Sequence, residues 1–128
     1  MPAPRFKLTA PIPYEVEIQK SILQYLTYHP MVAWAARFNS GSARLPAGGG
    51  KFRPVEFNTC DGCSDILGQL KDGRILAIEV KRPPWTKPTD KHEVAQEDFL
   101  KKVRVNNGVG FFATSIKQVT FCLDLARR

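Results

Sequence analysis

The chain has 128 residues, enough for one domain and hardly for two, and 19 Lys and Arg against 12 Asp and Glu leave a formal charge of +7. Hydrophobic residues at 43% and charged residues at 24% exclude wholesale disorder. The positive charge favours a polyanionic partner. No apolar run approaches the roughly 20 residues of a membrane-spanning helix, and the N-terminus has no apolar core of signal-peptide length. Three cysteines are a poor basis for a secreted disulfide scaffold. We therefore expect a reduced, cytoplasmic protein with no membrane partner.

The first half of the chain predicts an arm, a helix, a strand and a loop. Residues 1–13 hold four prolines and are expected to be an extended arm, followed by a single domain over residues 14–128. Apolar residues then recur at helical intervals, and the helix is expected to end at His29-Pro30. Residues 31–38 are typical of a buried strand. Residues 39–54 lose all periodicity and contain four glycines, which predicts a mobile loop.

The second half begins with two strand-like runs, residues 64–70 and 74–81, joined by a hairpin turn sequence at residues 71–73. A helix is expected next, with Asp90 as its N-cap and Glu93 as the N3 acid of a capping box.

That helix is expected to stop at Gly108 in the left-handed conformation, and residues 109–114 form another strand. Ser115 and Gln118 then predict a second capping box that opens a final helix. Its inward-facing residues would be Ile116, Val119 and Leu123. The predicted order α-β-β-β-α-β-α indicates an α/β sandwich around a small mixed sheet.

Two carboxylates stand in apolar surroundings within the predicted hairpin. Side chains alternate along a strand, so Glu79 shares a face with Ile75, Ala77 and Lys81 and is expected to be at least partly buried. An unpaired buried charge costs several kcal/mol, roughly, and Glu79 therefore needs a cation, a metal or a proton as partner. Asp65 raises the same question in the preceding strand.

The register of the hairpin decides whether the two acids meet. A loop with an odd number of residues, centred on Asp72 with Gly73 left-handed, puts Asp65 opposite Glu79, with β-carbons about 5 Å apart. A two-residue turn would instead put Asp65 opposite Val80, on the wrong face. We favour the odd loop, because it gathers both acids and the lysine at position 81.

Two carboxylates this close repel each other unless a divalent cation lies between them, and all-oxygen ligation suits Mg²⁺, with Mn²⁺ as a substitute. Lys81 projects on the same face and cannot be a ligand, but an ammonium beside such a pair fits phosphodiester cleavage. The alternative is a structural ion pair at a sheet edge, which is common for a lone Glu-x-Lys. The preceding Asp, the apolar context and the positive net charge favour the catalytic interpretation.

The sequences GCSDILG at residues 62–68, DGR at 72–74 and AIEVKRP at 77–83 resemble the PD-(D/E)XK nuclease signature. More narrowly, they are similar to the VRR-NUC family of that superfamily, in its small stand-alone, phage-type form. Residues 15–19, 37–41 and 96–100 extend the resemblance along most of the chain. Ser64 stands where the superfamily name has Pro, and Asn107-Gly108 replaces the more usual pair of glycines. The resemblance implies a restriction-endonuclease-like α-β-β-β-α-β core.

The resemblance also implies roles for individual residues. Asp65 and Glu79 would be metal ligands together with Val80, Lys81 would be the catalytic lysine, and Glu15 would be the helical acid that completes the metal site. From the residues alone, Glu15 lies on the apolar face of its helix, and it could instead complement the helix dipole.

Gln96 is the remaining predicted catalytic residue. It lies on the apolar stripe of its helix with Phe99 and Val103, which indicates a buried hydrogen-bonding role. Its partner could be the metal-bound water, the substrate or only the backbone.

Candidate nucleic-acid contacts lie before the hairpin, because no acidic residue occurs between Ile18 and Val55. A Gly-rich backbone with cationic side chains could approach phosphates closely. The predicted contacts are Arg37, Asn39, Arg44, Lys51 and Arg53. The alternative is a solvated loop.

Trp85 and the cysteine pair are weaker signals. Trp85 could stack on a base or simply pack. Cys60-x-x-Cys63 is half of a zinc site without suitably spaced completions, and a thioredoxin-like redox motif would need a helix after the pair.

The preferred hypothesis is a Mg²⁺-dependent endonuclease that hydrolyses DNA phosphodiester bonds. The resemblance implies a homodimer that cuts branched DNA such as four-way (Holliday) junctions, one strand per subunit. The alternatives are a non-catalytic DNA-binding module, in which the acids and Lys81 form a structural cluster, and a nickase or exonuclease on the same fold.

Overall fold

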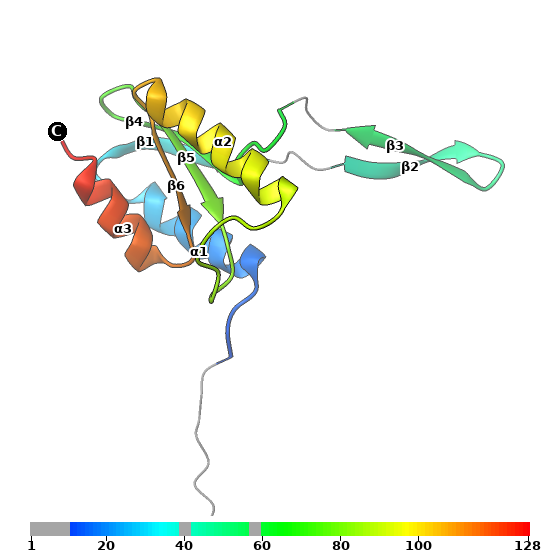
Figure 1. Ribbon diagram of the computed structural model, residues 1–128, viewed down its shortest axis with the longest axis horizontal. Coiled ribbons are helices and arrows are strands. Elements are labelled where there is room, and N and C mark those ends of the chain that lie inside the picture. The colour runs from blue at the N-terminus through cyan, green and yellow to red at the C-terminus, as the bar shows by residue number, and fades with distance from the viewer. Residues whose placement is uncertain (1–10, 39–41, 57–59) are drawn as a thin grey trace, which may run out of the picture.

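The computed structural model describes residues 11–38, 42–56 and 60–128. The protein is a mixed α/β protein, as predicted, with a four-stranded sheet in the order β1-β4-β5-β6 and a separate β2-β3 sheet (Figure 1). In chain order the elements are α1 (Glu15–Thr27), β1 (Val32–Arg37), β2 (Ser42–Gly48), β3 (Lys51–Glu56), β4 (Ile66–Leu70), β5 (Ile75–Val80), α2 (Lys91–Val105), β6 (Val109–Ala113) and α3 (Ile116–Leu125). No helix in these ranges is long and apolar enough to cross a membrane.

The four-stranded sheet is mixed because its connections differ in length. The short turn between β4 and β5 makes that pair antiparallel, and β1 also runs antiparallel to β4. Strand β6 is parallel to β5, because α2 carries the chain back across the sheet between them. Both neighbours of β5 therefore cover its edges, and this central strand carries the candidate site.

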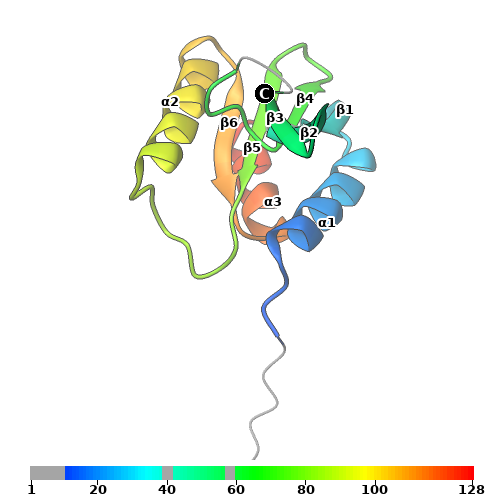
Figure 2. The same ribbon diagram turned by 90° about the vertical axis from the view of Figure 1, so that its right-hand side faces the viewer.

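Helices cover the two faces of the sheet unequally. Figure 2 shows α2 on one face, with α1 and α3 on the other. The main core lies on the α1–α3 side, where Ile22 and Leu26 of α1 meet Leu76 and Ile78 of β5 and Leu123 of α3, all completely buried. Ile22 and Leu26 belong to the apolar stripe that the helical spacing of α1 predicted. Because Ile78 faces this core and successive side chains of a strand alternate, Glu79 points to the α2 side of the sheet.

The predicted mobile loop over residues 39–54 is wrong for the part that the structure describes, because β2 and β3 form an antiparallel hairpin. Residues 39–41 lie outside the described residues. The turn is made by the three glycines, with φ angles of 88° at Gly48, 59° at Gly49 and 73° at Gly50. Prolines at 46 and 54 interrupt the apolar alternation, so the two short strands carry no clear period in the sequence. Figure 1 shows this hairpin projecting away from the four-stranded sheet.

Three local predictions need correction or confirmation. Asp90 caps α2 as predicted, because its Oδ1 accepts a hydrogen bond from Glu93 N at 2.8 Å. The left-handed residue after α2 is Asn107, with φ 69°, and not Gly108. A Cβ on Gly108 would lie 2.5 Å from Val103 Cγ1, so close packing requires glycine there. Ile116 was predicted to face the core, but it is 38% exposed, so that prediction is wrong.

The prediction of a reduced chain is wrong for Cys60 and Cys63, which form a disulfide with their Cα atoms 5.4 Å apart. Gly62 makes the bridge possible through its left-handed φ of 70°, which turns the chain back on itself. A side chain at Gly62 would also collide with the backbone of Ala95 in α2, 2.3 Å from its carbonyl oxygen. The disulfide turn therefore packs directly on α2.

Candidate active site

The hairpin register brings Asp65 opposite Glu79. Ile66 pairs with Ile78 in the β4–β5 ladder, and one more step along the same register reaches the two acids. Leu70 N donates to Arg74 O at 2.8 Å, which leaves residues 71–73 as a three-residue loop, and Gly73 has a φ of 96°. The odd loop favoured from the sequence is confirmed, and the two-residue turn is excluded.

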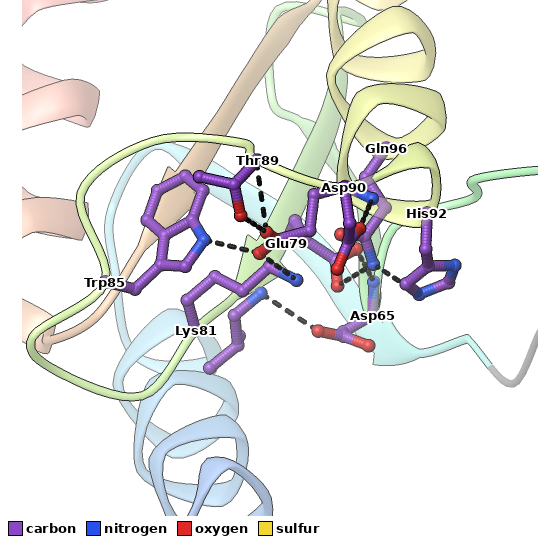
Figure 3. A network of polar contacts seen from close by, with 10 residues as sticks. Asp65, Glu79, Lys81, Trp85, Thr89, Asp90, His92 and Gln96 are labelled. Atoms are coloured by element: carbon purple, nitrogen blue, oxygen red, sulfur yellow. Dashed lines mark hydrogen bonds and ion pairs between the residues drawn. The ribbon is translucent and has the colours of Figure 1, made fainter.

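Asp65 and Glu79 are held in contact by the main chain of both strands. Asp65 N donates to Glu79 Oε2 at 3.2 Å, and Val80 N donates to Asp65 Oδ2 at 2.9 Å (Figure 3). Glu79 is only 2% exposed. The prediction that Glu79 is buried near the end of its strand is confirmed.

The buried position changes the protonation of Glu79. Burial, followed by the hydrogen bond and the negative charge of Asp65, raises the pKa of Glu79 to about 9, against the opposing charge of Lys81. The two carboxyl groups therefore hold a proton between them at neutral pH when no cation is present. A divalent cation would replace that proton.

Gln96 of α2 completes the hydrogen bonding of Glu79. Its Nε2 donates to Glu79 Oε1 at 2.7 Å and lies 3.2 Å from His92 Nε2 (Figure 3). Gln96 is 5% exposed, so the predicted buried hydrogen-bonding role is confirmed, but its Nε2 donates to the Glu79 carboxylate, which is none of the three partners suggested by the sequence. Its Oε1 is buried and has no hydrogen-bond partner among the described residues. That oxygen is an acceptor beside the carboxylate pair, where a donor such as a bound water would satisfy it.

Lys81 is buried on the same face, at 8% exposure, and its Nζ lies 3.3 Å from Glu93 Oε2. The same oxygen of Glu93 accepts a short hydrogen bond from Trp85 Nε1 (Figure 3). The other oxygen accepts from Thr89 N at 3.3 Å and from Thr89 Oγ1 at 3.1 Å. Desolvation by itself would raise the pKa of Glu93, but these donors and Lys81 outweigh it and lower that pKa. Glu93 is therefore a charged partner that fixes the lysine.

Glu93 is the residue of this cluster that sequence reasoning missed. Its position three residues after Asp90 predicted a capping role, and Asp90 does receive the N3 amide hydrogen bond. The carboxylate of Glu93, however, faces back toward Lys81 and Trp85. The residue spacing within α2 does not predict these contacts of Glu93, because they depend on the path of the segment between β5 and α2.

Glu15 lies near the carboxylate pair, at the first turn of α1. Its pKa is raised mainly by burial, then by the charge of Asp65, while Lys81 opposes and Glu93 adds to the rise. The acid predicted from the helical face is therefore in electrostatic contact with Asp65, Lys81 and Glu93.

The site offers two carboxylates and one main-chain carbonyl as possible ligands for a metal ion. Within residues 11–38, 42–56 and 60–128, no three His, Cys, Asp or Glu side chains converge closely enough to hold one. Asp65 and Glu79 supply two carboxylates, and Val80, whose side chain lies in the core, could contribute only its carbonyl oxygen. Mg²⁺ is commonly bound by one or two carboxylates, with waters and substrate phosphates completing its shell. The oxygen-only chemistry and the raised pKa of Glu79 fit such an ion.

The predicted nucleic-acid residues are not gathered in one place. Arg37 ends β1, paired with Ile66 next to the site, and its side chain is exposed. Lys51 and Arg53 are exposed on the β2–β3 hairpin. Arg44 is paired with Pro54 in the same hairpin, and Asn39 lies outside the described residues. The hairpin, and not a loop, carries most of this predicted positive charge.

Trp85 takes the packing role, because its ring lies 4.5 Å from that of Phe112 between centroids. Arg82, the residue after Lys81, holds the start of α1: its guanidinium donates to Ile12 O at 3.0 Å and to Pro13 O at 3.2 Å, and lies over the Tyr14 ring. These contacts keep the beginning of α1, and so Glu15, beside the end of β5.

No protein-family model, no curated protein and no solved structure matches the chain.

Proposed function

We propose that the protein is a divalent-metal-dependent endonuclease that hydrolyses phosphodiester bonds of DNA, with Mg²⁺ as its ion and a restriction-endonuclease-like core as its fold. The proposal is supported above all by one observation: two carboxylates in contact and a buried lysine lie together at the ends of β4 and β5. A purely structural ion pair with Lys81 would need only one acid. A second carboxylate beside it is costly, because burial and the neighbouring charge raise the pKa of Glu79 to about 9 and disfavour its ionised form. The resemblance to VRR-NUC nucleases points to the same chemistry.

The two acids would bind the metal ion, and Gln96 would support one of them. Asp65 and Glu79, with the Val80 carbonyl, would hold the ion, which when bound supplies an acidified water and neutralises phosphate charge. Glu15, whose charge reaches Asp65, would add negative charge near the ion and would not be a direct ligand in this arrangement. Gln96 keeps the Glu79 carboxylate in place through its 2.7 Å hydrogen bond.

Lys81 would place its ammonium against the charge that develops on the reacting phosphate. Its contact with Glu93 restricts its position. Gln96 Oε1, which lacks a partner in the described residues, could accept a hydrogen bond from a water at the ion.

The proposed substrate is branched DNA, cut by a homodimer at sites related by symmetry. A chain of this size offers one set of catalytic residues, whereas a four-way junction presents two equivalent strands, so a twofold dimer matches it. The charge of +7 supports a polyanionic substrate. This part of the proposal comes from the family resemblance.

One experiment separates the proposal from its rivals. The protein is incubated with a labelled four-way junction, a flap and a plain duplex, each with Mg²⁺, with Mn²⁺ or with EDTA. Paired cuts in the junction that need the metal would support the endonuclease. Binding without cutting would support a DNA-binding module, and single nicks or shortening from the ends would support a nickase or exonuclease.

A further inference from the structure

The β2–β3 hairpin has two different faces. Alternation along its register puts the positions of Arg44, Pro46, Phe52 and Pro54 on one face, and those of Leu45, Lys51 and Arg53 on the other. The side chains of residues 45, 46 and 51–54 are exposed, and Phe52 is 64% exposed close to the glycine turn. The hairpin is therefore a projecting ribbon that carries an exposed aromatic ring and exposed basic residues.

Such a ribbon lacks the means to stabilise itself. A two-stranded hairpin is at best marginally stable in water, and three strands or packing against a helix are normally needed. Figure 1 shows the ribbon reaching away from the helices and from the four-stranded sheet. Contact with a partner along the ribbon would supply the stabilisation that a two-stranded hairpin lacks.

Phe38 and Cys60, the described residues nearest to the ribbon on either side, are both connected to the segment that carries Asp65. Before the ribbon, Phe38 N donates to Asp65 O at 2.7 Å. After it, Cys60 is tied by the disulfide to Cys63, just ahead of Asp65. The described residues nearest to the ribbon on either side are thus tied to the segment that carries Asp65.

The charge of the ribbon indicates the class of partner. Lys51 and Arg53 are exposed on it, and the sequence has no acidic residue between Ile18 and Val55. A two-stranded ribbon is narrow enough for the major groove of B-DNA, about 12 Å wide. An exposed aromatic ring stacks on bases that are not already stacked in a duplex.

We propose that the β2–β3 ribbon is the arm that recognises branched DNA, with Phe52 stacking on bases exposed at the branch and with Lys51 and Arg53 neutralising flanking phosphates. The inference rests on the proposed function for its substrate, but it concerns binding and can be tested without cleavage.

The test measures binding of the full-length protein in EDTA to a four-way junction and to a duplex of the same length. Phe52→Ala is expected to weaken junction binding by about 5- to 100-fold, with little change for the duplex. The matched control is Phe121→Ala on α3, which removes a ring of the same 64% exposure and should change neither affinity.

Lys51→Ala/Arg53→Ala is expected to weaken binding to both DNAs and to reduce the salt dependence, with a slope shallower by about 1.8 for two lost phosphate contacts. Lys20→Ala/Lys117→Ala removes two exposed charges elsewhere and serves as its control. Circular dichroism and the thermal midpoint should match the wild type for all four variants.

The inference is overturned if Phe52→Ala binds the junction like the wild type, or loses duplex and junction affinity equally. It is also overturned if sedimentation shows that Phe52→Ala changes the oligomeric state, because the ribbon would then cover a second copy. Junction-selective binding through Phe52 without any Mg²⁺-dependent cutting would leave the inference standing and refute the nuclease.

Discussion

The ammonium of Lys81 lies 3.3 Å from the carboxylate of Glu93, so the first turn of α2 fixes the position of a buried cation on the neighbouring strand. Glu93 is itself held by Trp85 and Thr89, two residues of the segment that joins β5 to α2. A connecting segment and a helix thus position a strand residue, and the proposed catalytic lysine depends on all three elements.

Replacing Glu93 with Gln should therefore lower the cleavage rate while leaving DNA affinity unchanged. The amide keeps the shape but loses the charge that holds Lys81, and misplacement of a catalytic group by about 1 Å costs roughly 100-fold. We expect a single-turnover rate on a four-way junction lower by about 10- to 100-fold.

The matched control for Glu93→Gln is Glu97→Gln, one turn further along α2. Glu97 pairs with Arg104 at the surface, 2.6 Å away, and the ion pair that Lys81 makes in the described part of the chain is with Glu93. Its variant should cut at the wild-type rate. Equal losses in the two variants would mean that α2, and not the ion pair, was disturbed.

Neutralising either acid of the pair should stop cleavage and spare binding. Asp65→Asn and Glu79→Gln keep the size of the side chain, and removing negative charge near phosphates should not weaken association. We expect the cleavage rate to fall by more than about 100-fold. Mutating a residue that only hydrogen-bonds to a metal ligand already lowers metal affinity or activity by about 10- to 100-fold, and a ligand itself should matter more. A variant that cuts normally would refute the site.

Lys81→Ala should lose turnover and keep its metal, because an ammonium is not a ligand. Calorimetry with Mn²⁺, in the presence of DNA, measures directly whether the variant still binds the metal. If Lys81→Ala takes up no Mn²⁺ while it remains folded, the assigned roles are wrong.

The metal-free protein should become less stable as pH rises. Beside Asp65, Lys81 and Gln96, Glu79 has a pKa of about 9 in place of 4.5, so the folded state keeps a proton that the unfolded chain releases. The resulting stabilisation is complete below pH 4.5 and is lost as pH rises through 9, with a slope of at most about 1.4 kcal/mol per unit.

Urea unfolding in EDTA, at several values between pH 5 and 9, measures this slope. Glu79→Gln cannot ionise, and its free energy of unfolding should fall less over the same range. The difference between the two proteins isolates Glu79 from other titrating groups such as His29. If the free energies of unfolding of the wild type and Glu79→Gln changed equally with pH, Glu79 would be ionised in the metal-free fold.

Gly62→Ala should destabilise the fold by about 1–3 kcal/mol, because the new Cβ would meet Ala95 O at 2.3 Å and the φ of 70° disfavours a side chain. Gly73→Ala is the control, since its positive φ of 96° also disfavours a side chain, by at least as much as at Gly62, but nothing lies within 4 Å. Thermal unfolding should rank Gly62→Ala clearly below Gly73→Ala. Equal midpoints would mean that the disulfide turn does not rest tightly on α2.

Much of the core and of the carboxylate pair could be predicted because the signals are local. Helical spacing in α1 specifies the buried face with Ile22 and Leu26, since positions three and four apart share a side of the helix. The glycine of the β4–β5 turn allows the three-residue loop, and strand alternation then brings Asp65 to Glu79 whatever else the chain does.

The β2–β3 hairpin and the disulfide escaped sequence reasoning for a different reason. Pairing of Pro46 with Phe52 depends on the glycine turn between them, and neither strand buries a face that would show as a period. The cysteines are close in sequence, but only the left-handed Gly62 and its packing on α2 bring their sulfur atoms together.

The sequence by itself determined which acids could meet, because turn chemistry and side-chain alternation act within a few residues. Only the tertiary structure decided what surrounds them. Gln96 reaches Glu79, and Glu93 reaches Lys81, across gaps of 17 and 12 residues that the docking of α2 on the sheet closes. No spacing along the chain specifies such contacts, since they follow from how two packed elements are oriented in space.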